Sequence, residues 1–513
     1  MPKWLKDAVF YEIYPQSFYD TNGDGIGDFN GIIEKLDYIK ELGCNALWIN
    51  PCFDSPFHDA GYDVRDYKKV APRYGTNSDL YRLFGEAHLR GIHVLLDLVP
   101  GHTSEEHEWF LESQKAEKNE YSNRYIWTNA AFQPAKDFLY IGGETERDGV
   151  YVLNFFKCQP ALNYGFLEPQ EDWQLPMDHP DCIATRDAMK DVMRFWLDHG
   201  CDGFRVDMAD SLVKNDDEKK TGTSAIWREV REMLDEEYPE AAMVSEWNAP
   251  VKAINQGGFH MDFYLNWGGN GYNSLMRDYD TGEDNSYFKK DGKGDITRFL
   301  NEYTPRYEAT KENGYYCLIT CNHDTPRPKF NLDDSELKIA YAFIFTMPGV
   351  PFLYYGDEIG MRYQKELKTK EGGYQRTGSR TPMQWNSEKN AGFSTCPADA
   401  LYLPVDTAPD APNVADQAAE KGSLYNTVKD LIALRHREED LQADADFEAV
   451  YAEVGKHPFV YRRGGILVAL NPTTETVTAP VSADGWKVIF SIGSGKAENG
   501  TITLAPQSCI VLK

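Results

Sequence analysis

The chain has 513 residues, of which 42% are hydrophobic, as is usual for a folded protein of more than one domain. Its formal net charge of −28 at pH 7 disfavours nucleic acid and anionic membranes as partners, but it imposes no penalty on a neutral ligand. No apolar run reaches the ~18 residues of a membrane span, and the N-terminus leaves no room for a signal peptide, so we expect a cytoplasmic protein.

Short apolar segments alternate with longer amphipathic ones, which is the pattern of a parallel sheet with crossover helices. Eight segments are predicted as strands: 9–14, 46–50, 93–98, 203–207, 243–246, 261–265, 316–320 and 352–355. Helices are predicted at 31–42, 78–89, 187–197, 335–345 and 424–437. This alternation predicts a (β/α)₈ TIM barrel, whose active site would lie at the carboxyl ends of the strands.

Two further units are predicted outside the barrel. The segment 103–175 is too long for an ordinary connection and contains a predicted strand at 150–155, so we interpret it as an inserted domain B after the third strand. Beyond the last helix, alternating segments separated by Gly and Asp turns predict a C-terminal antiparallel β-sandwich at 441–513. The barrel itself would then comprise residues 1–102 and 176–440.

Cysteine occurs nine times, an odd and scattered count. The spacing matches neither a paired zinc-ligand pattern nor a disulfide framework. We therefore expect buried, reduced thiols.

Polar side chains follow four of the predicted strands. After the third, fourth, fifth and seventh strands stand Asp97 and His102, Asp207, Glu246, and His323 and Asp324. Any one of them could be a helix N-cap or a surface charge. Their coincidence at four strand ends favours a shared pocket.

Arg205 and Asp207 stand two residues apart on the fourth strand, so their side chains project to the same face. An arginine beside a carboxylate keeps it ionised, as a nucleophile requires. A buried structural ion pair is the alternative interpretation of this pair alone.

Glu246 is followed by Trp247, and an apolar neighbour favours the protonated form of a carboxyl group, as a general acid requires. His323 and Asp324 add an imidazole and a third carboxylate that could bind substrate hydroxyls. One ionised carboxylate, one proton-bearing carboxyl and one binding carboxylate suit acetal cleavage through an oxocarbenium-like transition state.

The motifs that carry these residues resemble those of the α-amylase superfamily, glycoside hydrolase family 13. Segments 97–102, 203–207 and 322–324, together with Glu246, are similar to its main motifs and stand in the same order. Segments 61–67, 159–163 and 349–358 are similar to further blocks. The resemblance extends over nearly the whole chain, and the ordered set is far more specific than any single block.

The resemblance implies a retaining double displacement. Asp207 would attack the anomeric carbon, Glu246 would protonate the leaving oxygen and then activate water, and Asp324 would bind ring hydroxyls in the −1 subsite. The two catalytic carboxyls are expected ~5–5.5 Å apart. The matching substrate-binding residues are Asp59, Tyr62 (the stacking platform), His102, Arg205, His323 and Arg380.

Within the family, segments 9–15 and 380–385 and the Gln159-Pro160 pair resemble the oligo-1,6-glucosidase and α-glucosidase branch. The resemblance implies an exo-acting α-glucosidase that takes short oligosaccharides in a blind pocket.

Four positions depart from the family pattern. Gly101 stands where many α-amylases have an Asn that ligates calcium, so that ion is expected to be absent, and Ala161 replaces a common Asp. Met208 follows the nucleophile where relatives with known linkage preference carry Val, Ala or Thr. Trp247 would reshape the +1 subsite. The linkage preference is therefore left open.

The segment 20–28 has oxygen donors at alternate positions and several glycines, a spacing that favours Ca²⁺ over Mg²⁺. It is not a full EF-hand, because Gly31 stands where the bidentate Glu should be. A plain Asp/Gly turn is the alternative. The resemblance implies a structural Ca²⁺ held by Asp20, Asn22, Asp24, the Ile26 carbonyl and Asp28.

Two alternative functions stay open. A transglucosylase, or a sucrose- or trehalose-active enzyme, would share every catalytic residue on the same scaffold. A non-catalytic sugar-binding or transporter-subunit relative is less favoured, because such relatives usually lose a catalytic carboxylate, and all three are present here. Linkage, chain length and oligomeric state are not predicted.

Overall fold

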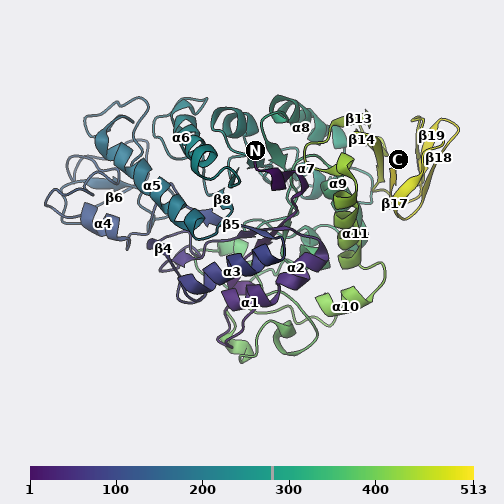
Figure 1. Cartoon of the computed structure of the whole chain (residues 1–513), viewed down its shortest axis with the longest axis horizontal. Helices are drawn as coiled ribbons and strands as arrows, with labels where there is room; N and C mark the ends of the chain where they lie inside the picture. The colour runs from purple at the N-terminus through teal and green to yellow at the C-terminus, as the bar shows by residue number, and fades with distance from the viewer. Residues whose placement is uncertain (279–281) are drawn as a thin grey trace.

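The computed structural model describes residues 1–278 and 282–513 (Figure 1). Its centre is an eight-stranded parallel sheet in the order β11-β10-β9-β8-β5-β2-β1-β12. The sheet closes between its outer strands, where Ile319 bridges Phe352 and the Thr320 amide donates to the Phe352 carbonyl at 2.9 Å. The strands are β1 (Phe10–Ile13), β2 (Ala46–Ile49), β5 (His93–Leu98), β8 (Gly203–Val206), β9 (Ala242–Ser245), β10 (Met261–Phe263), β11 (Tyr315–Cys317) and β12 (Phe352–Tyr354).

The barrel strands are buried on both faces. Apart from His93, every residue in the eight strands is buried. Parallel strands covered by helices read as continuous apolar runs, which is why the sequence predicts all eight. The prediction of a (β/α)₈ barrel is confirmed.

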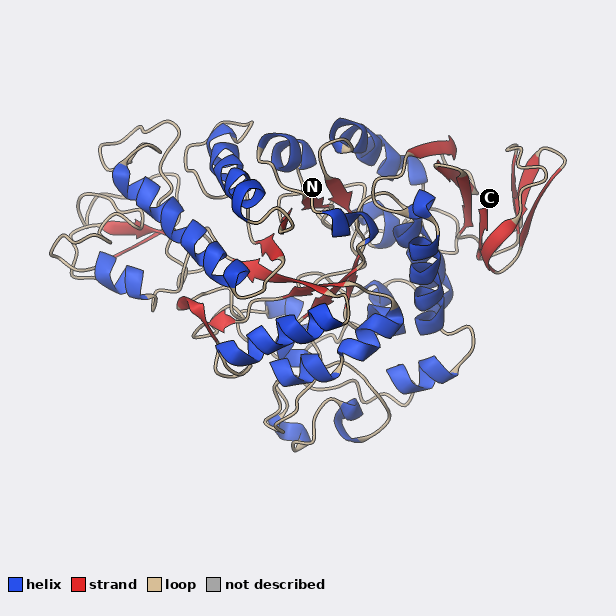
Figure 2. Cartoon of the chain, in the orientation of Figure 1, coloured by secondary structure: helices blue, strands red, loops and turns tan. Residues whose placement is uncertain are grey.

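Helices surround the barrel (Figure 2). The long ones are α3 (Asn77–Leu89), α5 (Pro180–Asp198), α6 (Thr221–Glu237), α8 (Ile296–Thr310), α9 (Asp334–Thr346) and α11 (Leu424–Arg437). The helix predicted at 31–42 is two helices, α1 (Phe29–Glu34) and α2 (Leu36–Leu42), because Lys35 leaves the helical conformation with φ −101° and ψ 2°. Gly43 ends α2 with φ 104°, the left-handed cap that glycine adopts without strain.

Shorter segments connect these elements. Two are the short helices α7 (Asn273–Met276) and α10 (Val414–Ala419). A π-helical segment spans Val251–Gln256. The 3₁₀ segments are Lys3–Asp7, Pro15–Ser17, Pro328–Phe330, Asp357–Ile359, Tyr374–Ser379, Lys389–Gly392, Ala398–Ala400 and Glu439–Leu441. A small hairpin of β3 (Phe53–Asp54) and β4 (Asp66–Val70) follows β2.

The segment between β5 and α5 carries elements of its own, namely α4 (Glu108–Ser113) and the antiparallel pair β6 (Tyr140–Gly142) and β7 (Val150–Val152). It has a separate small core of Ile126, Ala135, Val150, Val152, Ala161, Phe166 and Trp173. The strand predicted at 150–155 ends three residues early, at Val152. A bridge between His102 and Ala161 joins the segment to the end of the third barrel strand.

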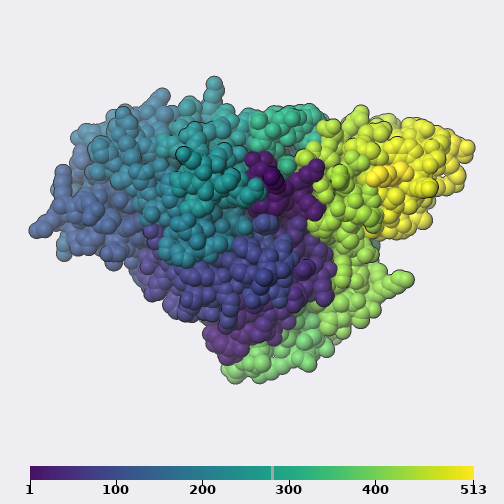
Figure 3. All heavy atoms as spheres, viewed as in Figure 1, coloured from purple at the N-terminus to yellow at the C-terminus, as the bar shows by residue number. Residues whose placement is uncertain are grey.

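The C-terminal residues form two antiparallel sheets, one in the order β13-β14-β15-β20-β17 and one in the order β16-β19-β18. Their bounds are β13 (Phe447–Tyr451), β14 (Phe459–Arg463), β15 (Ile466–Asn471), β16 (Val477–Ala479), β17 (Val488–Ile492), β18 (Gly495–Glu498), β19 (Thr501–Leu504) and β20 (Ser508–Leu512). In Figure 3 this unit (yellow) lies at the opposite end of the molecule from the inserted segment (blue).

All nine cysteines are free, and all but Cys158 are buried, as expected for reduced thiols. Within the described ranges, no helix combines the length and the apolar character needed to cross a membrane.

Candidate active site

The carboxyl ends of the barrel strands open into a cavity of about 180 Å³. It is lined by Asp59, Tyr62, His102, Phe155, Asp207, Met208, Glu246, Asp324 and Arg376. Six of the nine residues predicted for catalysis and substrate binding are among them. The other three, Arg205, His323 and Arg380, are buried behind the cavity wall and contact its lining. The structure therefore brings the whole predicted set together.

In the wall formed by the fourth and fifth strands, Arg205 contacts three carboxyl groups. Its Nη1 lies 2.8 Å from Asp97 Oδ1 and 3.0 Å from Asp207 Oδ1. Its Nη2 lies 2.9 Å from Glu246 Oε2. Register in the sheet aligns Asp97 on β5 with Arg205 on β8, which sets the three-way contact. One buried cation thus faces three carboxyl groups, so the cluster favours uptake of a proton.

The Asp207 carboxyl shows the consequence of this shortage of positive charge. Burial, and after it the negative charge of Glu246, raises the pKa of Asp207 well above its ordinary value, while Arg205 lowers it. The sequence predicts the effect of Arg205 in the right direction, but burial and the charge of Glu246 outweigh it. Asp207 therefore binds a proton at a higher pH than an exposed aspartate does.

Glu246 is held through one of its two oxygens. Besides Arg205, the backbone amide of Met208 donates to Glu246 Oε2 at 3.0 Å. Met208 adopts a left-handed backbone with φ 41°, which is strained for a residue with a side chain and often marks a functional site. Because both bonds engage Oε2, Oε1 is the oxygen that can approach a leaving group.

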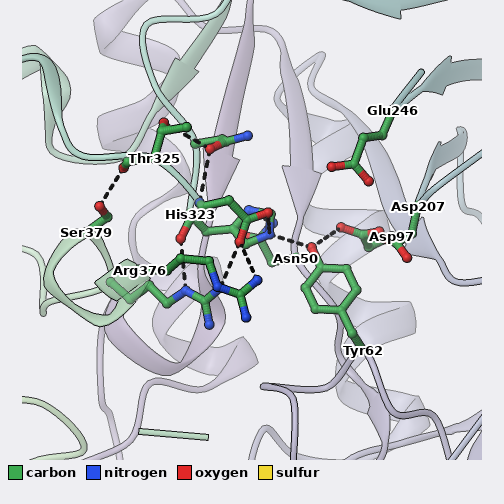
Figure 4. Close-up of polar contacts among 12 residues, drawn as sticks. Asn50, Tyr62, Asp97, Asp207, Glu246, His323, Thr325, Arg376 and Ser379 are labelled. Carbon is green, nitrogen blue, oxygen red and sulfur yellow. Dashed lines mark hydrogen bonds and ion pairs between the residues drawn. The ribbon is translucent and has the colours of Figure 1, made fainter. Parts of the chain in front are cut away.

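His323 connects the two sides of the site (Figure 4). Its Nδ1 lies 2.9 Å from Glu12 Oε1, and its Nε2 lies 2.7 Å from the Tyr62 hydroxyl and 3.2 Å from Asp324 Oδ2. Tyr62 in turn donates to Asp97 Oδ2 at 3.1 Å. Burial lowers the pKa of His323, but the carboxylates of Asp324 and Glu12 raise it more, to about 9. His323 is therefore a cation at neutral pH.

Asp324 is surrounded by positive charge. Arg376 Nη1 and Arg380 Nη2 lie 3.0 and 2.9 Å from its Oδ1. Burial raises the pKa of Asp324, but His323 and the two arginines lower it further, so the net pKa lies well below the ordinary value. Asp324 is thus a permanent carboxylate, suited to accepting hydrogen bonds from hydroxyl groups.

Arg376 also closes the far wall of the cavity. Its Nη2 lies 3.4 Å from Asp59 Oδ1, so one guanidinium joins Asp59 to Asp324. Gln159, from the inserted segment, donates to Asp59 Oδ2 at 2.8 Å. Burial raises the pKa of Asp59 by more than the Arg376 charge and the Gln159 bond lower it, so its net pKa lies above the ordinary value.

His102 is held by groups on both of its nitrogens. Nε2 lies 3.1 Å from the Tyr62 carbonyl, which can only accept, and Nδ1 lies 3.1 Å from Asn154 Nδ2, which can only donate. Burial lowers the pKa of His102 to about 4, so the ring is neutral with its proton on Nε2. A Cβ at Gly101 would lie 2.7 Å from Asn154 Nδ2, so the glycine makes room for the amide that fixes this tautomer.

The two unusual neighbours of Asp207 and Glu246, the carboxyls predicted to be catalytic, differ in placement. Met208 lines the cavity. Trp247 is 4% exposed, packs edge-on against Phe259 and is not part of the cavity lining. Because Trp247 does not line this cavity, the structure gives no direct support to its predicted effect on the +1 subsite.

Sequence reasoning missed several residues of the site. Glu12 is a fully buried acid inside β1, and a lone charge in an apolar strand is the signal that could have revealed it. Arg376 stands four residues before Arg380 in a 3₁₀ segment with no periodic pattern. Asn154 and Phe155 come from the inserted segment, where nothing in the sequence fixes how the chain meets the barrel.

The predicted calcium loop is closed by its own hydrogen bonds. Asp20 accepts the Gly23 amide on Oδ1 at 2.8 Å, and the Gly25 amide and the Ser394 hydroxyl on Oδ2. Asp28 caps α1 by accepting the Gly31 amide at 2.7 Å. These oxygens would have to exchange hydrogen bonds for metal contacts.

The middle of the loop is similar, since Asp24 Oδ1 accepts the Ile26 amide and Asn22 Oδ1 accepts the Asp24 amide, both at 2.9 Å. In residues 1–278 and 282–513, no group of three or more His, Cys, Asp or Glu is arranged to hold a metal. These oxygens are occupied by hydrogen bonds within and around the loop, and Ca²⁺ at this loop stays a prediction.

Comparison with known proteins adds independent findings. Residues 12–444 match the family model "Alpha amylase, catalytic domain", and residues 445–511 match a domain of unknown function. The chain is 32% identical to an oligo-1,6-glucosidase of Heyndrickxia coagulans, with 98% of each chain covered. It is 34% identical to a trehalose synthase/amylase of Mycolicibacterium smegmatis, over 85% of this chain and 76% of that protein.

Among solved structures, an isomaltulose synthase mutant from Erwinia rhapontici, in complex with D-glucose, superposes with a TM-score of 0.81 at 28% identity. The match covers 100% of this chain and 99% of that one. The resemblance seen in the sequence is confirmed. The chain belongs to the α-amylase family of glycoside hydrolases, glycoside hydrolase family 13, and is an enzyme of its glucosidase and transglucosylase group.

Proposed function

We propose that this enzyme is a retaining α-glucosidase that hydrolyses terminal α-glucosidic bonds of short oligosaccharides. The observation that carries the proposal is the shape and charge of one cavity. Its volume of about 180 Å³ is below the ~300–1,000 Å³ of pockets for drug-sized ligands, which suits a single sugar ring. The Arg376 bridge from Asp59 to Asp324 stands opposite the catalytic pair and blocks passage of a longer chain.

In the first step, Asp207 attacks the anomeric carbon and forms a covalent bond to it. The bond from that carbon to the leaving oxygen breaks, and Glu246 gives its proton to that oxygen. The raised pKa of Asp207 favours a proton on this carboxyl. Catalysis needs that proton on Glu246, and Arg205, at 3.0 Å from Asp207, supports the nucleophile as the anion.

In the second step, the Glu246 carboxylate takes a proton from water, the water oxygen attacks the anomeric carbon, and Asp207 leaves as a carboxylate. Two inversions give net retention. Asp324 stays ionised throughout, because His323, Arg376 and Arg380 stabilise its charge. Its hydrogen bonds to ring hydroxyls would strengthen as positive charge develops on the sugar.

Glucosyl transfer to a second sugar is the alternative reaction. It is favoured by one feature of the site, the Phe155 ring, which lines the cavity while 45% exposed and presents an apolar face to an acceptor. Two relatives bear names of this kind, trehalose synthase/amylase and isomaltulose synthase. The balance between water and sugar as acceptor decides between the reactions.

A panel of α-1,4-, α-1,6-, α-1,2- and α-1,1-linked glucose disaccharides, sucrose and starch tests the proposal, with Asp207→Asn as the inactive control. We expect free glucose from one or more disaccharides and little release from starch. Strong starch hydrolysis would contradict the blind pocket. Disaccharide isomers or longer chains with little free glucose would establish the transferase instead.

We also propose that the enzyme works in a reducing compartment such as the cytoplasm. Nine free thiols, eight of them buried, support this location. The charge of −28 suits a neutral sugar as substrate.

A further inference from the structure

A buried aspartate stands directly behind the turn that carries the proposed general acid. Asp262 is in the middle of β10, and the sheet register pairs it with Ser245 on β9, the residue before Glu246. Its side chain is fully buried. Across residues 1–278 and 282–513, no lysine or arginine forms an ion pair with it, although removing an unpaired carboxylate from water is costly.

Four hydrogen bonds offset that cost, and their donors flank Glu246 on both sides. They are Ser245 Oγ at 2.7 Å, and the amides of Trp247 at 3.2 Å, Asn248 at 3.3 Å and Ala249 at 2.8 Å. Oδ2 takes the Ala249 amide and Oδ1 takes the other three. The carboxylate therefore binds and fixes the backbone of the whole turn after β9.

The same turn is fixed from a second side. Asn248 adopts a left-handed backbone with φ 56°. Its Oδ1 accepts the Leu265 amide at 3.1 Å and the Tyr316 hydroxyl at 3.2 Å. The side chain of Asn248 thus anchors the turn to β11 and to the loop after β10. Burial raises the pKa of Asp262 to about 7, while the Ser245 and backbone bonds lower it.

We infer that Asp262 is a positioning residue for Glu246: it holds the turn after β9 so that the free oxygen of Glu246 reaches the leaving oxygen of the substrate. The inference rests on the proposed function, in which Glu246 is the acid. It follows from geometry, since Asp262 is not part of the cavity lining and its carboxylate bonds to Ser245 and to the amides of the turn.

The test compares two substrates that differ in their need for an acid. The fluoride ion leaves α-D-glucosyl fluoride without being protonated. In a disaccharide accepted by the wild type, the leaving oxygen needs a proton from the acid. In Asp262→Asn, the amide NH₂ would face at least one of the four donors and loosen the turn. General acids contribute roughly 10²–10⁴-fold, so we expect kcat/KM for the disaccharide to fall about 30-fold and that for the fluoride less than about threefold.

Three controls frame the measurement. Glu246→Gln gives the reference pattern, a large loss with the disaccharide and a small one with the fluoride. Ser245→Ala removes one donor and keeps the three amides, so both substrates should stay within about threefold of wild type. Thermal unfolding and circular dichroism check that each variant is folded.

Tyr316→Phe keeps the inference testable if Asp262→Asn does not fold, because it loosens Asn248 and leaves the carboxylate intact. A selective loss of about threefold with the disaccharide is expected there. Equal losses with both substrates, or no loss, in folded Asp262→Asn or Tyr316→Phe would overturn the positioning role. Failure of the wild type to act on either substrate would instead overturn the proposed function.

Discussion

The protonation states of individual side chains in this site depend on how many oppositely charged groups each of them contacts. Arg205 faces three carboxyls, while Asp324 is surrounded by His323 and two arginines. One wall therefore tends to hold a proton and the other stays ionised. Under the proposed function, this division would place a proton donor beside the scissile bond and a fixed anion near the sugar hydroxyls, as acetal cleavage requires.

The raised pKa of His323 makes a prediction about pH. Its folded value is about 9, above the ordinary 6.5, so its charge stabilises the fold fully below about pH 6.5 and progressively less up to about pH 9. The full effect is worth about 3 kcal/mol. In melting curves, the stability gap between wild type and His323→Gln should narrow from pH 6 to pH 9.

The comparison isolates the charge, because packing lost in the variant does not depend on pH. A gap that is constant or grows with pH would contradict a cationic His323. The same titration should weaken the hold on Asp324, so kcat/KM of the wild type should fall above about pH 9.

At the scale of elements, the inserted segment completes the site through Asn154. A Cβ at Gly101 would also lie 2.9 Å from Ser211 Oγ, to which Asn154 Nδ2 donates at 3.3 Å, so it would crowd both partners of this bond. Lys214 Nζ holds the other end of the same amide, 3.0 Å from Asn154 Oδ1. Gly101 thus leaves the space that the Asn154 amide occupies, and the two residues act as a pair.

Gly101→Ala should displace Asn154 and release His102, lowering kcat/KM about tenfold, since small misplacements at an active site are costly. Gly85→Ala is the control, because a Cβ there meets nothing within 4 Å. Gly85→Ala should keep full activity and gain a little stability from its place in α3. Wild-type activity in Gly101→Ala would show that the pair has no role in positioning His102.

What the sequence predicts well are elements with continuous apolar runs. All eight barrel strands and α11 are found close to their predicted bounds. The strands that were not predicted include β4 and β6, in which exposed and half-buried residues outnumber buried ones, so they carry little apolar signal. The break at Lys35 has no Gly or Pro to mark it.

The site residues can also be divided into those that the sequence predicts and those that it does not. Asp207 and Glu246 follow readable strands, so their convergence can be predicted from strand order. Arg376 and Phe155 come from irregular segments whose course depends on packing between distant parts of the chain. Asp262 has no motif, and its role rests on a register that only the assembled sheet defines.

At the scale of the whole molecule, the cavity is built where the barrel meets the inserted segment, and the C-terminal sheets lie at the other end (Figure 3). The loop around Asp20 joins the start of the barrel to the distant segment that carries Ser394. Any ion bound there would act on global stability rather than on the reacting sugar.

The calcium prediction is therefore tested by stability. If Ca²⁺ binds, 5 mM CaCl₂ should raise Tm over EDTA-treated protein by several degrees, because ligands that bind only the native state stabilise it. Asp24→Ala should abolish the difference, since Asp24 is a predicted ligand and bonds only within the loop. An unchanged Tm in wild type would show that the loop is a plain turn.

In the proposed mechanism, Asp207 forms a covalent bond to the sugar. Incubation with 5-fluoro-α-D-glucosyl fluoride, a slow substrate that accumulates the intermediate, followed by proteolysis and mass spectrometry, measures it directly. We expect a fluoroglucosyl adduct on the peptide that contains Asp207, and none in Asp207→Asn. An adduct on another carboxylate, or turnover with no adduct and inverted product, would contradict it.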